Sequence, residues 1–208
     1  MDYMKYCLVA LLVFLSSCTL INNVTQREKA IETIRNYILA LEEENFSKFE
    51  INTYSESEEL KKLCFDSLIL AIQLNKKLKR KYGPLAIEDF NLYKKHSYIG
   101  ISDLPVKLDY DKLNDLKFRK HNGKIGIFDP QTHTFFTFKK HGDRLMVNLQ
   151  EDVIDMAKYI NLIKESIQFM NHVIENVNAG KAEGKTIKEF AKEYTYEGQA
   201  KDAVIKVW

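Results

Sequence analysis

Apolar residues recur at three- and four-residue spacing through the first half of the chain, a period typical of amphipathic helices. The spacing predicts a first helix over residues 26–44, with Thr25 and Glu28 as its capping box. The period breaks over 45–54, and Ser55 with Glu58 is expected to open a second helix. Gly83-Pro84 is expected to end that helix, because glycine often follows a helix end and proline cannot continue one. The apolar positions are Ala30, Ile34, Tyr37, Ile38 and Leu41 in the first helix, and Leu60, Leu63, Cys64, Ala71, Leu74 and Leu78 in the second.

Helical spacing returns after this second helix. It predicts a short helix over 85–93, a long one over 153–177, and two short closing helices near 187–194 and 197–207.

Apolar and polar residues alternate between 98 and 149, which indicates β-strands. Clear alternation covers 106–110, 116–119 and 124–128, and in 134–138 Phe136 and Phe138 are expected to share one face while Phe135 takes the other. Turns are predicted at Asn122-Gly123, Asp129-Pro130 and His141-Gly142-Asp143.

This order predicts an α+β fold: N-terminal helices, an antiparallel β meander of four to six strands, and C-terminal helices packed on one sheet face. No repeat, linker or low-complexity stretch divides residues 25–208, so we expect them to form a single domain.

The N-terminal stretch has the shape of a signal peptide. A short polar start with Lys5 leads into an apolar run over 7–15, which ends at Ser16. Crossing the hydrocarbon of a bilayer takes about 20 apolar residues, so a transmembrane anchor is the weaker alternative.

Leu15-Ser16-Ser17-Cys18 resembles the lipobox of bacterial lipoproteins, in which a branched apolar residue and two small residues precede the acylated cysteine. The resemblance implies a signal peptide over 1–17, lipid attachment at Cys18 and a tether over 18–24. The protein would then be lipid-anchored in a bacterial cell envelope, with its domain outside the cytoplasm. Thr19 rather than Asp after the cysteine favours the outer membrane if the cell is Gram-negative.

Composition is that of a folded globular protein, with 45% hydrophobic and 29% charged residues. The 31 Lys and Arg nearly balance the 29 Asp and Glu, so charge does not indicate nucleic acid as a partner. Of the three cysteines, Cys7 would leave with the signal peptide and Cys18 would carry lipid. Cys64 would then have no intramolecular partner, and its place on an apolar stripe predicts a buried, inert thiol.

Candidate chemistry is sparse. Residues 179–186 match a relaxed phosphate-loop pattern, but a helix rather than a strand is predicted before them, so Thr186 with Glu189 is better interpreted as a capping box. His96, His121, His133 and His141, with Asp129 and Asp143, lie in or near the β region without the spacing of a metal site, and His172 is expected to be solvated. Adjacent Glu42, Glu43 and Glu44 make a poor acid–base pair. We therefore predict no catalytic, cofactor-binding or metal residue.

Cations crowd the end of the second helix, at Lys76, Lys77, Lys79, Arg80 and Lys81. They complement the negative end of the helix dipole. Contact with anionic lipid is the alternative interpretation.

The order of helices and strands, with the charged turn 139–144 leading into an apolar strand, resembles the NTF2-like α+β cone of envelope lipoproteins. We expect a non-catalytic domain that binds an envelope protein, a glycan or a small ligand close to the membrane. The alternatives are an enzyme, such as a hydrolase, that uses the pocket of an NTF2-like cone, and a structural lipoprotein that braces the envelope.

Overall fold

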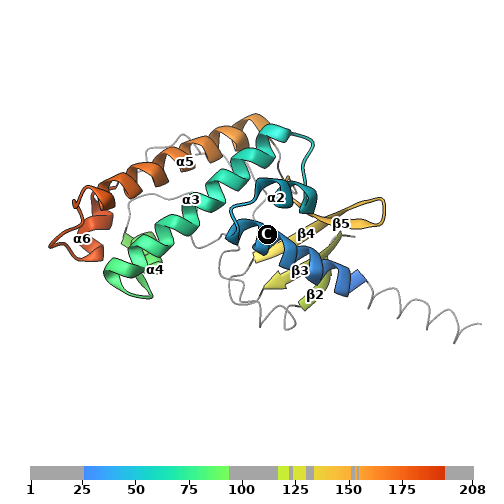
Figure 1. Ribbon diagram of the computed structural model, residues 1–208, viewed down its shortest axis with the longest axis horizontal. Helices are drawn as coiled ribbons and strands as arrows, with labels where there is room; N and C mark the ends of the chain where they lie inside the picture. The colour runs from blue at the N-terminus through green and yellow to red at the C-terminus, as the bar shows by residue number, and fades with distance from the viewer. Residues whose placement is uncertain are drawn as a thin grey trace, which may run out of the picture.

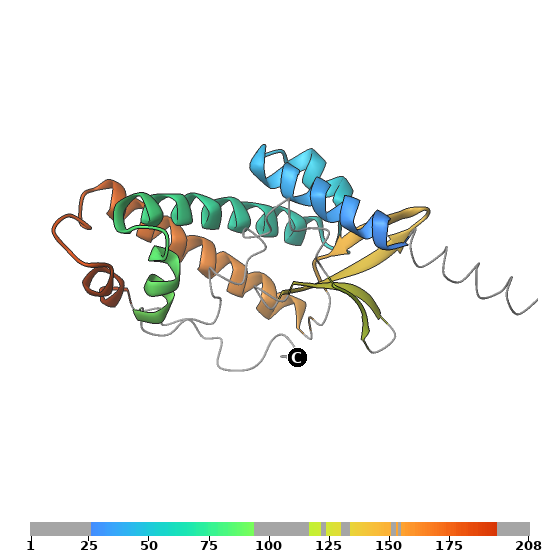
Figure 2. The same ribbon diagram turned by 90° about the horizontal axis from the view of Figure 1, so that it is seen from below.

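The structure is a computed structural model that describes residues 26–93, 117–121, 124–129, 134–150, 153 and 155–194. It is a mixed α+β fold in which a small sheet lies at one end and two long helices, side by side, extend away from it (Figures 1 and 2). The mixed α+β class predicted from the sequence is confirmed.

An opening helix spans residues 26–42 and buries the apolar stripe predicted for it, including Ala30, Ile34 and Leu41. The break predicted after it is wrong in part, because residues Phe46–Asn52 form the short helix α2. The Asn45 side chain caps α2 by accepting a hydrogen bond from Lys48 N, and Phe49 on its inner face is fully buried.

Helix α3, Glu58–Tyr82, is the long helix predicted from the apolar period. Its N-cap is Ser57 rather than Ser55: Ser57 Oγ accepts from Leu60 N, while Ser55 Oγ accepts from Ser57 N and supports the cap from outside. The predicted stop is confirmed, since Gly83 follows at φ +96°, a conformation that favours glycine. Helix α4, Ala86–Tyr93, follows directly.

The sheet has the strand order β1-β5-β4-β3-β2. Four consecutive strands form antiparallel hairpins, namely β2 Lys117–His121, β3 Lys124–Asp129, β4 Thr134–His141 and β5 Arg144–Asn148. Strand β1, only Thr53–Tyr54, adds to β5 in parallel. The sheet is therefore mixed and not a purely antiparallel meander, because a two-residue strand between α2 and α3 joins its edge. The strand predicted over 106–110 lies outside the described residues.

Two hydrophobic cores share the long helices. The first joins the opening helix, α2 and the first half of α3 to the sheet, with Ile127, Phe136 and Val147 buried in it. Helix α5, Met156–Asn178, contributes Ile163 to this core and Met170 with Val173 to the second. The second core joins the far halves of α3 and α5 to α4 and to α6, Ile187–Lys192.

The second core corrects one sequence expectation. Only the first half of α5 packs toward the sheet, whereas α6 packs on α4 at the opposite end of the molecule (Figure 1). The apolar stripe of α5 is long enough to contribute residues to both cores. Helix α6 follows the end of α5 that lies far from the sheet, so it packs in the second core. The closing helix predicted near 197–207 lies outside the described part.

Candidate functional site

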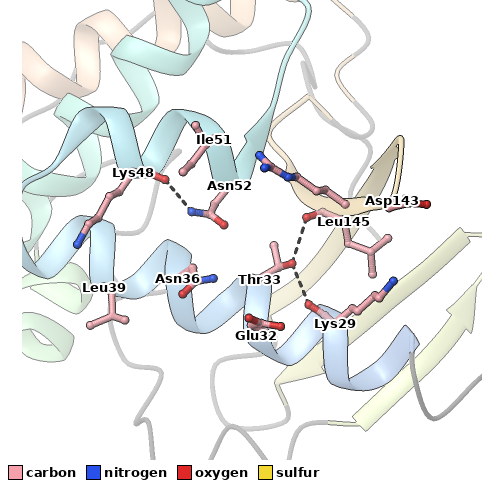
Figure 3. A pocket seen from close by; sticks show the side chains of 11 residues that line it. Lys29, Glu32, Thr33, Asn36, Leu39, Lys48, Ile51, Asn52, Asp143 and Leu145 are labelled. Atoms are coloured by element: carbon pink, nitrogen blue, oxygen red, sulfur yellow. Dashed lines mark hydrogen bonds between the residues drawn. The ribbon is translucent and has the colours of Figure 1, made fainter.

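A groove of about 500 Å³ lies between the opening helix, α2 and the β4–β5 hairpin (Figure 3). Its lining residues come from three separate stretches of sequence. They are Lys29, Glu32, Thr33, Asn36 and Leu39 on the opening helix, Lys48, Ile51 and Asn52 on α2, and Asp143, Arg144 and Leu145 on the hairpin.

The two helical walls are the polar faces left over when each helix buries its apolar face. On the opening helix, positions 29, 32, 33 and 36 follow helical spacing and lie beside the buried stripe. On α2, Phe49 enters the core, so Ile51 points outward and keeps 55% of its surface exposed. Ile51 is thus an exposed aliphatic side chain in a lining that is otherwise mostly charged or polar.

The third wall is held in place by a hydroxyl. Thr33 is buried, and its Oγ1 lies 3.1 Å from Leu145 O on β5 and 2.9 Å from Lys29 O in its own helix (Figure 3). Strand β1 covers β5 only at Val147 and Asn148, so it does not reach Leu145. The single proton of the Thr33 hydroxyl is shared between Lys29 O and Leu145 O, and the second contact ties the helix to a carbonyl at the edge of the sheet.

Replacing Thr33 by Val is expected to destabilise the protein by about 1 to 2 kcal/mol, because the nearly isosteric side chain leaves a partly buried carbonyl unpaired. At about 2 to 4 °C per kcal/mol for a chain of this size, the loss is readily seen in a thermal melt. Thr33→Ser keeps the hydroxyl and serves as the matched control. A Val variant that melts with the wild type would show that this contact does not support the hairpin.

The charges of the groove are mixed. Lys29, Lys48 and Arg144 are positive, Glu32 and Asp143 are negative, and all five side chains are exposed. Lys48 also pairs with Glu43 at the end of the opening helix. The groove therefore presents exposed charges of both signs beside amides and aliphatic side chains.

The sheet face that an NTF2-like enzyme would leave open is packed with side chains in the described part of the sheet. Ile127, Phe136 and Val147 are at most 5% exposed, and Phe138 packs against the same core. The prediction that Phe136 and Phe138 share one face is confirmed. The side chain of Phe135 lies outside what the structure describes.

Three titratable groups with strongly raised pKa values lie in the first core or pack against it. Burial raises the pKa of Tyr37 and Tyr159 well above that of a free tyrosine, and it raises the pKa of Cys64 to about 12. At neutral pH the Cys64 thiol is therefore protonated, which makes it a poor nucleophile. The predicted burial of Cys64 is confirmed.

The structure describes only some of the candidate histidines. His141 is exposed beside the β4–β5 turn, and His121 ends strand β2. His96 and His133 lie outside the described residues. His172 is exposed on α5, as predicted, but its Nε2 lies 3.1 Å from Asn176 Nδ2 and its ring packs edge-on against Tyr194. Within the described ranges no group of three or more His, Cys, Asp or Glu side chains is placed to hold a metal ion.

The phosphate-loop pattern forms the loop between α5 and α6. A helix precedes it, and Thr186 with Glu189 makes the predicted capping box, in which the Thr186 side chain accepts from Glu189 N and Glu189 accepts from Thr186 N. That hydrogen bond holds the pKa of Glu189 below its usual value. The loop also binds α3, through an ion pair between Lys81 and Glu183. These residues have structural partners of their own, as the sequence indicated.

The predicted lipidation residue, Cys18, and the whole of residues 1–25 lie outside the described part of the chain. In the part that is described, none of the helices has the length and apolar character needed to span a bilayer. Comparison of the chain with protein-family models, with curated proteins and with solved structures gives no match. The site is therefore defined by its geometry alone.

Sequence reasoning did not find this groove. It considered Asp143 as a turn residue and beside the histidines as a metal candidate, and it did not consider Lys29, Lys48 or Ile51. The one local signal is the polar face of the opening helix, which pattern analysis assigns to solvent by default.

Proposed function

We propose that this chain is a lipid-anchored protein of a bacterial cell envelope whose domain binds a partner through the groove and catalyses no reaction. The anchor would be Cys18, and its support is the Leu15-Ser16-Ser17-Cys18 motif after an apolar run. Two or three acyl chains would hold the protein firmly, whereas one alone binds only marginally.

The position of the groove supports this assignment. Lys29 and Glu32 lie in the first two turns of the opening helix, whose described part begins at residue 26. Seven residues, 19–25, separate that helix from Cys18 and span at most about 24 Å when extended. A partner bound in the groove would therefore lie close to the bilayer.

The lining of the groove favours a protein segment over a small ligand or a glycan. Pockets for small molecules enclose most of the ligand and are lined mainly by apolar and aromatic groups. This groove is open to one side, and its lining set holds five charged residues and no aromatic one. Mixed charges around exposed aliphatic groups resemble the rim and centre of a modest protein interface.

A photoreactive amino acid in place of Ile51 tests this proposal in cells that express the full chain. We expect one discrete crosslinked envelope protein from position 51, and at least a tenfold weaker band when Lys48→Glu and Arg144→Glu are added. Gln168, exposed on α5 and outside the groove lining, is the control position. Equal bands from both positions, or no band from position 51, would contradict groove binding.

A further inference from the structure

The last two turns of α3 carry three cations that have no acidic partner in the described part of the chain. Lys76, Lys79 and Arg80 are exposed. Their neighbours Lys77 and Lys81 differ, because Lys77 Nζ donates to Asn178 Oδ1 at 2.7 Å and Lys81 pairs with Glu183. The helix thus uses two of its five cations to bind the α5–α6 loop and leaves three free.

The three free cations form a ridge on one face of the helix. At 100° per residue, positions 76, 79 and 80 lie within about 100° of one another and point away from the stripe of Leu74 and Leu78 that fills the second core. We call this face the basic ridge. Like charges at three- and four-residue spacing repel one another, so the ridge costs the isolated helix a little stability.

The helix dipole explains only part of the ridge. Lys79 and Arg80 lie in the last turn of α3, where they complement its negative end, but Lys76 lies six residues before Tyr82 and outside that turn. The dipole also gives no reason for Leu85, which follows the Gly83-Pro84 turn and leaves 65% of its surface exposed. Leu85 is thus an exposed apolar side chain three residues past Tyr82, at the same end of α3 as the cations.

The basic ridge lies on the side of α3 that α2 covers nearer the start of the helix. Phe65 lies on this face of α3 three turns earlier, and there it is covered by α2 through Phe46 and Phe49, with ring centroids 5.4 and 5.2 Å away. Beyond α2, none of the described helices or strands is drawn over that face of α3 (Figure 2). The side of the molecule that carries the opening helix therefore also carries the basic ridge.

We infer that the basic ridge and Leu85 form a second contact with the membrane, in which the cations bind the phosphate headgroups of anionic phospholipids and Leu85 enters the interface. This inference rests on the proposed lipid anchor, which keeps the domain at a bilayer. An extended tether of at most about 24 Å lets the molecule lie along the surface, with the anchor at one end. The 25 residues of α3 span about 37 Å, so the ridge would touch the same bilayer at the other end.

The chemistry favours lipid over an acidic protein. Each basic residue near an anionic bilayer increases the binding constant roughly fivefold, so three such residues increase it by about a hundredfold. Leu85 is a single exposed leucine, and the described surface around it has no larger apolar patch that a protein partner could cover. Its burial among lipid acyl chains would therefore stabilise a membrane contact more than a protein contact.

The test uses the full chain in vesicles of phosphatidylcholine with or without phosphatidylglycerol. A fluorescent thiol dye is placed at the exposed neighbouring position, Pro84→Cys, so that Leu85 stays in place. Cys64 is buried and lipid would occupy the sulfur of Cys18, and the unsubstituted chain labelled in parallel gives the background. Lipids with a nitroxide headgroup quench the dye when the tip touches the bilayer. We expect quenching in vesicles with phosphatidylglycerol at low salt, and its loss in high salt or in phosphatidylcholine alone.

Two matched triple variants decide the outcome. Lys76→Gln, Lys79→Gln and Arg80→Gln together should lower the ratio of docked to free tip by about a hundredfold. Lys140→Gln, Lys158→Gln and Lys192→Gln change the net charge equally at exposed positions elsewhere and should change that ratio by less than fivefold. Equal loss in both variants, quenching independent of phosphatidylglycerol, or a dye response only to added envelope protein would overturn the inference. The mass of the N-terminal peptide from the same sample reports the anchor separately, so failure of the anchor and failure of the ridge are distinguished.

Discussion

The Phe49→Ala substitution is expected to lower the free energy of unfolding by about 3 to 5 kcal/mol, a large share of the 5 to 15 kcal/mol typical of a folded domain. Phe49 is fully buried, and its ring lies 5.3 Å from Tyr37 and 5.2 Å from Phe65, measured between centroids. Truncation leaves a cavity where α2, α3 and the opening helix meet. Denaturant unfolding followed by circular dichroism measures the loss.

Phe46→Ala is the control for this substitution. Phe46 lies on the same short helix and is only partly buried, so its loss should cost about 1 to 2 kcal/mol. If the two variants were equally stable, α2 would not be held by its buried phenylalanine. The groove wall that α2 provides would then need another explanation.

The Phe190→Ala substitution is expected to act at the other end of the molecule. Phe190 is fully buried, with ring centroids 5.0 Å from Tyr194, 6.1 Å from Tyr82 and 6.3 Å from Phe90. Helix α6 has six residues, too few to be stable without tertiary packing. The loss of about 3 to 5 kcal/mol should therefore open α4 and α6 locally.

Hydrogen–deuterium exchange resolved by peptide distinguishes local from global opening. We expect amides of α4, α6 and the 179–186 loop to lose protection, while β4 and β5 keep theirs. Ile187→Ala, at a partly buried position of the same helix, should give a smaller change. Equal loss of protection in β4 and β5 would mean that the two cores unfold as one unit.

Helices with long apolar periods could be predicted from the sequence, and short elements could not. Helix α3 has a buried stripe from Leu60 to Leu78 and a Gly-Pro stop, so local pattern alone defines it. Helix α2 has seven residues and one fully buried side chain, Phe49. Its stability comes from the aromatic cluster around Phe49, whose members belong to three helices, and such contacts do not appear in a local pattern.

The same reasoning explains the sheet and the far end of the molecule. Antiparallel hairpins such as β4–β5 are local, and the turn residue Gly142, at φ +59°, marks this one in the sequence. Strand β1 pairs Thr53 with Val147, nearly a hundred positions away, and two residues carry no alternation. The second core likewise depends on contacts between α4 and α6, which nothing in either short helix indicates by itself.

The candidate site combines the two cases. Lys29 and Asn36 could be assigned to a polar helix face from spacing alone, whereas Ile51 became a surface residue only because α2 forms and Phe49 takes its inner face. The hairpin wall depends on the bond from Thr33 to Leu145, across 112 positions. A groove assembled from three segments in this way has no sequence motif.

The mass of the N-terminal peptide of the protein, purified from bacterial envelope membranes, tests the central claim most directly. We predict a peptide that begins at Cys18 and carries diacylglycerol on its sulfur, and that disappears together with the membrane-bound fraction when Cys18 is replaced by Ser. A mature chain that keeps an unmodified thiol at Cys18, or a Ser variant that stays in the membrane fraction, would contradict the claim.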